Sequence, residues 1–274
     1  MTKLRIPCPA KVNLFLAVGP PDRRGYHPLR TVFQAVALYD FLDVEFGGPP
    51  TWKVEVDGAE LPAENTVSKA LRLSQEVFAV APSRVRLEKH IPMQSGLGGG
   101  SSDAAGLLRA LDHIRPGSPE EMRSLAAAVG ADVPFFLAGG RAKGEGYGDQ
   151  ITPLPDAPEE WYVIAKPPIG CSTPEMYARL DEKPREWRDW PEGDELCNDF
   201  ERVAPCECLD LTERLRILGA RDAALSGSGS SVFGRFADEG AATAAAASMK
   251  SEGHAQVWVA KGLSRRESLR IDRL

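Results

Sequence analysis

Short apolar runs bounded by proline, glycine and aspartate fill the first third of the sequence. They lie at residues 11–18, 31–37, 43–46, 52–56 and 85–87, and their length and alternation predict β-strands. Residues 65–79 instead repeat apolar positions at helical spacing, and either Asn65 or Thr66 can cap the start of that helix. We therefore expect a strand-rich region with one helix inserted before its last strand.

Helical periodicity dominates the middle of the chain. The glycine cluster at 96–100 runs into a segment whose apolar residues recur with helical period up to Ile114, which predicts a loop that leads into a helix. A second helix is predicted at 119–129, because Glu120 and Glu121 suit the positive end of a helix dipole and Gly130 can end the helix.

Strands and helices alternate after a proline-rich stretch at 152–160. We expect strands at 161–165 and 256–260, helices at 173–180, 209–218 and 239–251, and a strand-turn-strand pattern within 223–236. The proline-rich stretch is the best candidate for a linker. We therefore expect one domain at residues 1–155 and a second at 156–274. The pattern alone supports a mixed α and β protein.

The composition is that of an ordinary globular protein. Its 274 residues are 43% hydrophobic and 26% charged, and 33 Lys and Arg against 39 Asp and Glu give a net charge of -6. An acidic chain attracts neither nucleic acid nor an anionic membrane surface, so a polyanionic ligand must be held locally.

The sequence shows no pattern typical of secretion or of membrane insertion. Its N-terminal apolar stretch is broken by Pro7, Pro9 and Lys11, which does not suit a secretory signal, and no window reaches the roughly 18 apolar residues that span a bilayer. Its five cysteines are scattered, which fits reduced thiols better than disulfides. We therefore expect a cytoplasmic protein.

The glycine-rich stretch is the most informative part of the sequence. Glycine lets backbone N–H groups approach an oxyanion closely, and the helix that follows adds unpaired N–H donors and a positive dipole end. The stretch is not a Walker loop, because no Lys-Ser/Thr pair follows it, and it departs from the Rossmann fingerprint. A surface turn would need fewer glycines. We therefore expect a phosphate site formed by Pro92, Met93, Gln94, Ser95, Gly96, Leu97, Gly98, Gly99, Gly100, Ser101 and Ser102.

The polar residues that end this stretch leave alternatives open. The hydroxyls of Ser101 and Ser102 can donate to a phosphate or bind Mg²⁺, but they can equally cap the helix. The carboxylate of Asp103 can cap N–H groups and complement the helix dipole, and this structural role is the favoured interpretation.

Two further charged residues interrupt apolar runs. Lys11 and Asn13 share one face of a strand by the two-residue period, although a solvated edge would also explain them. Asp132 lies between Gly130 and the apolar residues 133–136, where a buried carboxylate would need a partner. From composition alone, a cap or turn role is favoured for Asp132.

Three blocks of sequence resemble the GHMP kinase superfamily, which includes galactokinase, homoserine kinase and mevalonate kinase. They are PAKVNLFL at 9–16, PMQSGLGGGSSDAA at 92–105 and LSGSGSSVFG at 225–234, and their order and spacing cover most of the chain. Within the superfamily, RRGYHPLRTVFQAV at 23–36, GADVPFF at 130–136 and Asn198-Asp199 resemble the branch of 4-diphosphocytidyl-2-C-methyl-D-erythritol kinases.

The resemblance implies a fold and an activity. The fold is α+β, with two domains and the active site in the cleft between them. The activity is ATP-dependent phosphorylation of the 2-hydroxyl of a cytidine-diphosphate-linked methylerythritol, in the non-mevalonate route to isoprenoids. ATP and Mg²⁺ are the implied cofactors, and this small molecule is the implied partner.

The resemblance also implies roles for single residues. Asp132 matches the catalytic base of the family and Lys11 its partner, while the glycine-rich stretch matches the phosphate loop. Asn65 corresponds to a residue near the adenine. The substrate is expected to contact Asn13, Tyr26, His27, Thr173 and Tyr177, of which Tyr26 and His27 would bind the cytosine and Tyr177 would close its pocket.

Several features stay open at this point. The second glycine block, at 225–231, could hold phosphate or form a hairpin turn, and we expect it near the cleft. The charged segment 181–195 is predicted to be a surface loop and matches no part of the family, and the ligands of the metal are not visible. A homoserine or mevalonate kinase is an alternative, as is a non-catalytic nucleotide-binding relative, although the presence of Lys11 and Asp132 argues against the latter.

Overall fold

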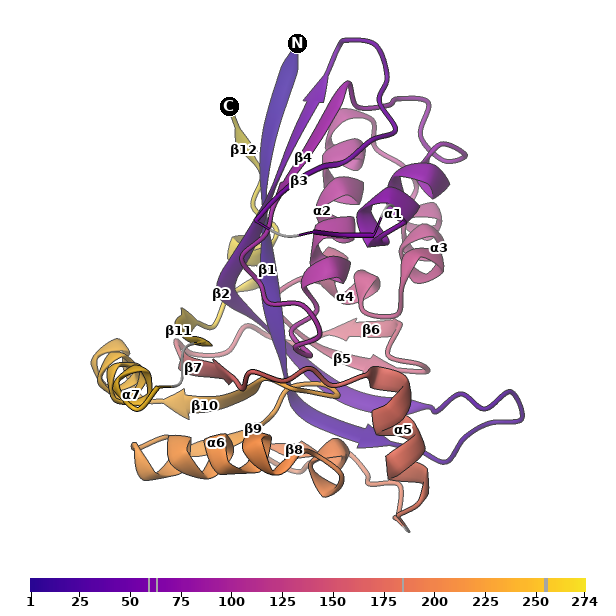
Figure 1. Cartoon of the computed structure of the whole chain (residues 1–274). Helices are drawn as coiled ribbons and strands as arrows, with labels where there is room; N and C mark the ends of the chain where they lie inside the picture. Colours follow the sequence, from indigo (N-terminus) through magenta and orange to yellow (C-terminus); the bar gives the residue numbers. More distant parts are fainter. Residues whose placement is uncertain (59, 63, 184, 254–255) are drawn as a thin grey trace.

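Two β-sheets form the centre of the molecule in the computed structural model, which describes residues 1–58, 60–62, 64–183, 185–253 and 256–274. The larger sheet has the strand order β12-β1-β2-β4-β3, with β5 and β8 pairing to its central strands and β6 to β5. The smaller sheet has the order β11-β7-β10-β9. Figure 1 shows the larger sheet running the height of the molecule and the smaller one beside its lower half.

The larger sheet is built on one long antiparallel pair. Strands β1 (Thr2–Val18) and β2 (Leu29–Phe46) pair along their whole length. The sequence predicted β1 only from residue 11, but a proline is tolerated next to a bulge, and the register shifts directly after Pro9. It also predicted two strands in place of β2, because Asp40 interrupts the apolar pattern; the structure buries that carboxylate fully.

The remaining strands of the larger sheet are short. The predicted strand at 52–56 is replaced by one that begins at Glu55, and the strands near residues 141–153 were not predicted. These strands are β3 (Glu55–Asp57), β4 (Arg84–Glu88), β5 (Arg141–Glu145), β6 (Gln150–Pro153), β8 (Cys197–Asn198) and β12 (Asp272–Arg273).

Helices cover one face of the larger sheet (Figure 1). They are α1 (Thr66–Ser74), α2 (Gly99–Ile114), α3 (Pro119–Val129) and α4 (Val133–Ala138). Helix α2 lies closest to the sheet, because Gly106 has no side chain and a Cβ there would lie 2.5 Å from Cys8 Sγ. Its leucines Leu107, Leu108 and Leu111 are fully buried, and each contributes roughly 1.5–3 kcal/mol of apolar burial. Helix α1 ends at Ser74, earlier than the predicted 79, and the short α4 was not predicted.

The smaller sheet lies between the larger sheet and two helices. Its strands are β7 (Trp161–Lys166), β9 (Asp222–Leu225), β10 (Val232–Phe236) and β11 (Gln256–Lys261). Side chains along β7 point alternately to the two faces of this sheet. Val163 and Ala165 pack toward α6 (Cys206–Ile217) and α7 (Glu239–Ser251), whereas Tyr162 and Ile164 join the core beside β1. The other helical segments are α5 (Thr173–Asp181), η1 (Asp199–Arg202) and α8 (Arg265–Ser268).

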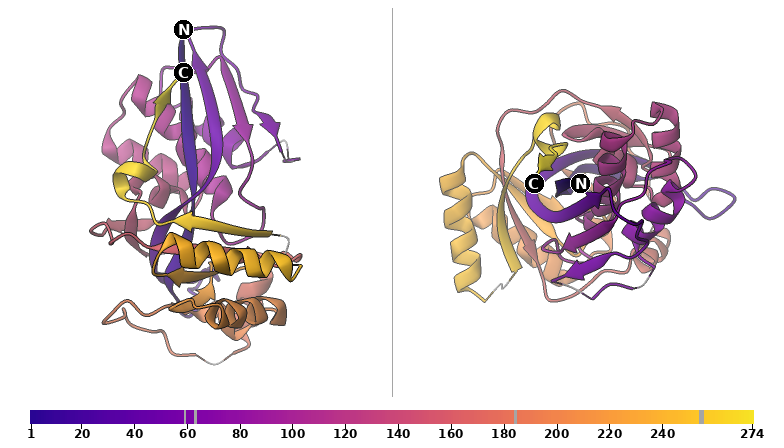
Figure 2. Two further views of the ribbon diagram at one scale, coloured as in Figure 1. Left: turned by 90° about the vertical axis from the view of Figure 1, so that its left-hand side faces the viewer. Right: turned by 90° about the horizontal axis from the view of Figure 1, so that it is seen from above.

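The chain crosses between its two halves more than once. Residues 154–160 lie outside the helices and strands and lead from β6 to β7, as expected of a linker. However, β8 pairs with β1 in parallel, and β12 returns to pair with β1 near the N-terminus. Figure 2 accordingly shows the two ends of the chain side by side. The division at residues 155 and 156 stays a prediction.

Two further expectations concern cysteines and membranes. All five cysteines are free thiols, as their scattered positions predicted. None of the helices in the described part of the chain combines the length and the apolar character that crossing a membrane requires.

Candidate active site

The glycine-rich stretch forms a loop between β4 and α2 that only glycine can build. Gly96 and Gly98 both have φ of 73°, in the left-handed region that favours glycine. A Cβ on Gly96 would also lie 2.0 Å from the carbonyl oxygen of Ser226. Gly98 is the N-cap of α2 and gives that helix no side-chain cap, so backbone N–H groups of the first turn remain available to a ligand.

The loop is fixed from two sides. The backbone N–H of Lys11, in β1, donates to the carbonyl of Leu97 at 2.9 Å. On the other side, the second glycine block connects β9 and β10 as a hairpin loop and lies against the first block. There, Ser231 N donates to Ser95 O at 3.0 Å and Ser226 Oγ donates to Gly96 O at 3.0 Å. The two blocks that the sequence separates by about half the chain therefore form one surface.

A cavity of about 300 Å³, which we call the loop cavity, opens over the loop. The expected adenine neighbour Asn65 lines it, but its side chain also caps α1, accepting from Val67 N and Ser68 N at 3.0 Å each. The loop residues that line this cavity are Pro92, Met93, Gln94, Ser95, Gly96, Gly98, Gly99, Gly100 and Ser101.

The carboxylate of Asp103 makes no cap hydrogen bond to α2, so its predicted role as a helix cap is wrong. Its carboxylate accepts from Lys89 Nζ at 2.8 Å, and Lys89 also donates to Asp40. Asp40 in turn accepts from the backbone N–H of Ile91 at 2.8 Å. This buried cluster of Asp40, Lys89 and Asp103 joins the start of the glycine loop to the helix after it. Sequence patterns missed it because its three members lie far apart in the chain.

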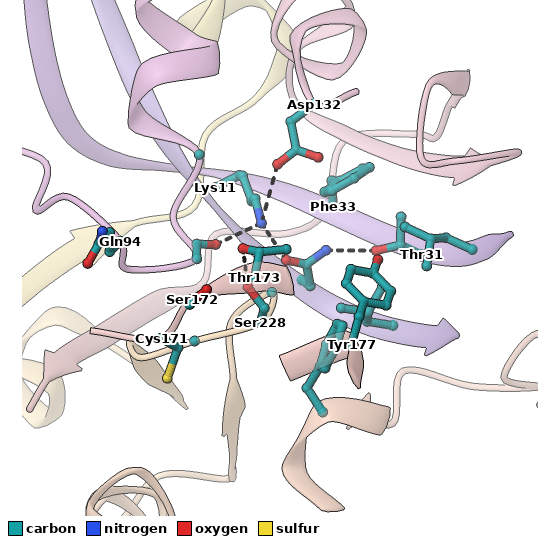
Figure 3. Close-up of a pocket in the computed structure, with 18 of the residues that line it drawn as sticks. Lys11, Thr31, Phe33, Gln94, Asp132, Cys171, Ser172, Thr173, Tyr177 and Ser228 are labelled. Carbon is teal, nitrogen blue, oxygen red and sulfur yellow. Dashed lines mark hydrogen bonds and ion pairs between the residues drawn. The ribbon is translucent and has the colours of Figure 1, made fainter. Parts of the chain in front are cut away.

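Lys11 and Asp132 meet at a second cavity of about 400 Å³, the central cavity (Figure 3). Lys11 Nζ donates to Gly96 O at 2.7 Å and to Asn13 Oδ1 at 2.6 Å, and it lies 3.8 Å from Asp132 Oδ2. The Lys11 side chain is 4% exposed, so it is no solvated edge residue. Burial lowers the pKa of its ammonium, and the Asp132 carboxylate opposes that shift.

The position of Asp132 excludes the capping role that composition favoured. Asp132 precedes α4, but its side chain makes no cap hydrogen bond to that helix. Its carboxylate is 34% exposed and points into the central cavity toward Lys11. A carboxylate that is partly exposed and faces the cavity is placed to accept a proton from a group bound there.

Thr31 is a residue of this cavity that the sequence did not single out. Its hydroxyl accepts from Asn13 Nδ2 at 2.8 Å and donates to Phe15 O at 2.7 Å. It therefore fixes the Asn13 amide so that the amide oxygen faces Lys11. The strand pairing of β1 with β2 brings Thr31 here, and a single strand pattern does not reveal that register.

A third cavity of about 770 Å³, the hairpin cavity, lies between the β1–β2 hairpin and α5. The predicted residues Tyr26, His27, Thr173 and Tyr177 all line it. Thr173 and Tyr177 line the central cavity as well, so the two cavities adjoin. The loop cavity shares Gly96 and Gly98 with the central cavity in the same way.

The aromatic residues of the hairpin cavity differ in how firmly they are held. Tyr26 is 62% exposed, whereas the His27 ring is buried and stacks on Tyr177 with 4.9 Å between centroids. Burial, together with the Asp132 carboxylate, raises the pKa of Tyr177 to about 12, so this side chain stays a neutral phenol. The Tyr26 ring meets the Tyr147 ring edge-on, with 5.8 Å between centroids, and its exposed surface can stack on a planar ligand. Tyr177 provides a second ring.

Metal-binding residues are sparse in this region. Within residues 1–58, 60–62, 64–183, 185–253 and 256–274, no group of three or more His, Cys, Asp or Glu side chains could hold a metal ion. Mg²⁺ in proteins is often held by one or two side chains and the phosphates of its substrate. Ser101 fits that pattern: it lines the loop cavity, and its hydroxyl lies 3.9 Å from the Cβ position of Gly130, beside the Asp132 turn.

Comparison with protein families gives two matches along the chain. The model of the GHMP kinases N terminal domain matches residues 65–140, and that of the GHMP kinases C terminal domain matches residues 171–255. A 4-diphosphocytidyl-2-C-methyl-D-erythritol kinase of a Nocardioides species is 36% identical over 93% of this chain and 95% of its own length. The enzyme of the same name from Nitrosococcus oceani is 37% identical over 93% of both chains.

Solved structures show the same fold. A crystal structure of 4-(cytidine 5'-diphospho)-2C-methyl-D-erythritol kinase matches with a TM-score of 0.82 and 33% identity, over 94% of this chain and 98% of the other. A homoserine kinase from Cytophaga hutchinsonii matches with a TM-score of 0.72 at 17% identity, over 99% and 97%, and so shares the fold. The chain therefore belongs to the GHMP kinase family, within its branch of 4-diphosphocytidyl-2-C-methyl-D-erythritol kinases.

Proposed function

We propose that the chain transfers the γ-phosphoryl group of ATP to the 2-hydroxyl of 4-diphosphocytidyl-2-C-methyl-D-erythritol. The observation that supports this most directly is the position of the Lys11 ammonium. It touches the glycine loop through Gly96 O at 2.7 Å and lies 3.8 Å from the Asp132 carboxylate. A phosphoryl donor held by the loop and an acceptor hydroxyl beside Asp132 would meet at this ammonium.

ATP would bind in the loop cavity. Backbone N–H groups of the loop and the first turn of α2 would bind its phosphates, with the helix dipole favouring their charge. The rigid support of the loop by β1 and by the second glycine block would hold these donors in place before the nucleotide arrives. The adenine would lie toward Asn65, at the outer side of the same cavity.

Lys11 and Asp132 would carry the transfer step. Phosphoryl transfer depends mainly on in-line positioning and on stabilising the charge of the transferred group, and the Lys11 ammonium would do this in a water-poor setting. Asp132 would accept the proton of the attacking hydroxyl. Asn13, held by Thr31, would keep the ammonium directed at the cavity.

Mg²⁺ would accompany ATP, with the Ser101 hydroxyl as its protein ligand beside the phosphate oxygens. The ion would offset the negative charge of the phosphates. The cytidine diphosphate would extend from the central cavity into the hairpin cavity, with the cytosine between Tyr26 and Tyr177.

A coupled assay of ATP consumption tests this proposal. With 4-diphosphocytidyl-2-C-methyl-D-erythritol, homoserine and mevalonate as separate acceptors, we expect turnover only with the first. Asp132→Asn should lower kcat by about 10²–10⁴, the usual contribution of a positioned general base, without loss of ATP affinity. Asp210→Asn, on the exposed side of α6, is the matched control. Turnover of homoserine or mevalonate instead, or near-normal kcat in Asp132→Asn, would contradict the proposal.

A further inference from the structure

The segment after α5 was predicted to be a surface loop, and the family resemblance gave it no role. In the structure, residues 185–190, which we call the strap, cross the base of the β1–β2 hairpin. This hairpin carries Tyr26 and His27 and projects beyond the sheet beside α5 (Figure 1). Much of the strap is exposed, but its first residue, Arg185, has a side chain that is only 8% exposed.

The Arg185 guanidinium binds the end of β1. Its Nε donates to Val18 O at 3.1 Å and its Nη2 to Gly19 O at 3.2 Å. Its Nη1 donates to Leu180 O at 2.8 Å, so the same side chain also holds the last turn of α5. A guanidinium carries its N–H donors on three nitrogens in a fixed planar fork, so it reaches carbonyls that lie farther apart than those a single ammonium nitrogen can bridge.

The same guanidinium lies against the His27 ring, with Nη2 3.4 Å from His27 Nδ1, and it also reaches the ring through two partners. Nη2 forms an ion pair with Asp181 Oδ1 at 3.2 Å, and Asp181 Oδ2 lies 3.3 Å from His27 Nε2. His27 Nδ1 lies 2.9 Å from Gly19 O, the carbonyl that Arg185 also binds. The ring is therefore held at both nitrogens by groups that Arg185 fixes.

The strap also binds the other strand of the hairpin. Arg30, near the start of β2, donates to Arg188 O at 2.8 Å and to Asp189 Oδ1 at 2.7 Å. Its guanidinium lies 4.3 Å from the centre of the Trp187 ring. That ring packs against Gly19, where a Cβ would lie 3.1 Å from Trp187 Cε2. Both strands are thus joined to the strap at the base of the hairpin.

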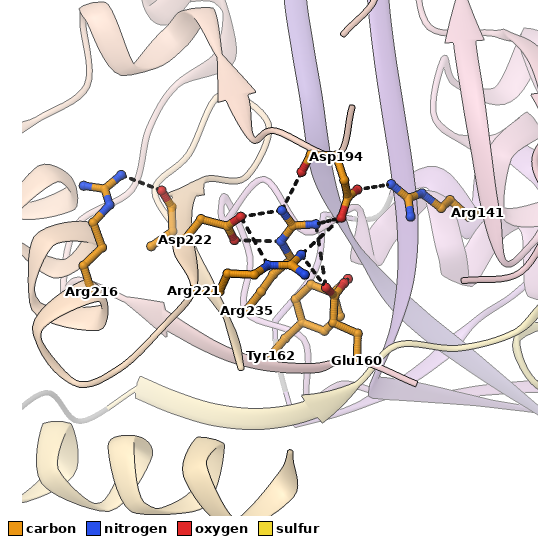
Figure 4. Close-up of polar contacts among 9 residues, drawn as sticks. Arg141, Glu160, Tyr162, Asp194, Arg216, Arg221, Asp222 and Arg235 are labelled. Carbon is orange, nitrogen blue, oxygen red and sulfur yellow. Dashed lines mark hydrogen bonds and ion pairs between the residues drawn. The ribbon is translucent and has the colours of Figure 1, made fainter. Parts of the chain in front are cut away.

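The chain beyond the strap is fixed to both sheets. Asp194 accepts from Arg235, in β10, at 2.6 Å and from Arg141, in β5, at 2.5 Å (Figure 4). Arg235 is almost fully buried, and its guanidinium also binds Asp222. The strap is therefore held between α5 at one end and this ionic cluster at the other.

The tip of the hairpin has separate support. Asp22 accepts from the backbone N–H of Arg24 at 2.8 Å and of Tyr26 at 3.0 Å, which makes the turn rigid in itself. Tyr147 donates to Asp22 at 2.6 Å from the other side of the hairpin cavity. Backbone hydrogen bonds also hold the base, from Gly19 N to Pro28 O at 2.8 Å and from Leu29 N to Gly146 O at 2.7 Å. The strap adds the side-chain contacts that act on His27 itself.

We propose that the strap positions the β1–β2 hairpin for the cytidine moiety, with Arg185 as the positioning residue. This inference rests on the proposed function, because it assigns the hairpin cavity to the cytidine. Arg185 contacts no ligand itself. Its side chain keeps the hairpin in the conformation that binds the cytidine. Without the Arg185 guanidinium, the hairpin would populate other conformations as well. The apparent Kd then rises in inverse proportion to the fraction of molecules in the binding state.

Calorimetry with CDP and with ATP on the full-length protein tests this inference. In Arg185→Met, which keeps most of the aliphatic length, a hairpin that is competent a tenth of the time would weaken CDP about tenfold. ATP should bind as in the unchanged protein, because Arg185 touches no residue of the loop cavity. Arg185→Lys should bind CDP with an affinity between those of Arg185→Met and the unchanged protein. Arg179 is an exposed arginine of α5, and Arg179→Met should leave the affinity for CDP unchanged.

Kinetics separate positioning from a general structural role. In Arg185→Met we expect a raised KM for the cytidine substrate with kcat and KM for ATP nearly unchanged. Hydrogen exchange should accelerate at residues 19–28 and slow again when CDP saturates the protein. Asp181→Asn, which removes the partly exposed link to His27, gives a second variant with the same expected pattern.

The opposite outcomes are distinct. Unchanged CDP affinity in both variants, or an equal loss of CDP and ATP affinity, would overturn the role of the strap. Failure of the unchanged protein to bind CDP while it binds ATP would instead overturn the assignment of the hairpin cavity, and with it the proposed function.

Discussion

Replacing Lys89 by methionine tests how the buried ionic cluster stabilises the glycine loop. The Lys89 side chain is 5% exposed and lies between the carboxylates of Asp40 and Asp103, which are 0% and 1% exposed. Methionine has a similar length but no charge, so both carboxylates would lose the cation between them. Removing one partner of a buried ion pair costs about 3–5 kcal/mol, a large part of the stability of a typical protein.

The size of this loss should depend on pH. Burial raises the pKa of Asp103 well above its usual value; Asp40 adds to that shift and Lys89 opposes it. Without Lys89 the pKa of Asp103 in the folded state rises further. The folded variant then keeps a proton that the unfolded chain has already lost above its ordinary pKa of 3.8. Stability falls with rising pH in that window, by up to about 1.4 kcal/mol per pH unit for one proton.

Urea unfolding of the variant at two pH values measures both effects. We expect a lower midpoint with an unchanged m-value, and a larger deficit at about pH 8 than at about pH 5.5. Lys3→Met is the matched control, since it removes a lysine from an exposed pair with Glu45 at 3.1 Å and should cost at most about 1 kcal/mol. If Lys89→Met cost no more than Lys3→Met, or lost more stability at the lower pH, the account of the cluster would be refuted.

Two further predictions concern the ligands. Tyr26→Ala should raise KM for the cytidine substrate by about tenfold, since stacking of a base on an aromatic ring is worth roughly 1–3 kcal/mol, and should leave KM for ATP nearly unchanged. Equal changes in both constants would remove Tyr26 from base recognition. Gly96→Ala should raise KM for ATP, because the new Cβ would lie 2.0 Å from Ser226 O and because a φ of 73° favours glycine. Gly117→Ala serves as the control, since the atom nearest to its new Cβ would lie 3.5 Å away. Steady-state kinetics would show this, and an unchanged KM for ATP would speak against the loop geometry.

Local patterns predicted the parts of the site that are continuous in sequence. Helices at 119–129 and 239–251 agree with α3 and α7, because their capping residues and apolar spacing are both clear. The glycine loop could be predicted because a simple turn needs fewer glycines than this stretch contains. The short α4 was not predicted, since six residues do not establish a helical period.

Contacts between distant residues could not be predicted in the same way. The sequence correctly predicted that Lys11 and Asn13 share a face, and their hydrogen bond confirms it. It gave no sign that Lys89 binds Asp103, because a buried ionic cluster looks like a set of unrelated surface charges when each member is examined alone. The family resemblance brought Asp132 and Lys11 together; a count of apolar positions would have made one a cap and the other an edge residue.

The two-residue period of a β-strand fails to predict the orientation of side chains after Leu14 of β1. Asn13 pairs with Phe33 and Phe15 with Val32, so Leu14 is the extra residue of a β-bulge. Before the bulge, the odd-numbered Lys11 and Asn13 line the central cavity, and after it the even-numbered Leu16 does. On β2, only odd-numbered residues of the pair line the same cavity: Leu29, Thr31 and Phe33. A strict two-residue period would turn Leu16 away from the cavity, so the bulge is what keeps β1 facing it from the phosphate loop to the hairpin. One extra residue thus lets a single strand carry both the Lys11 ammonium and the base-binding hairpin.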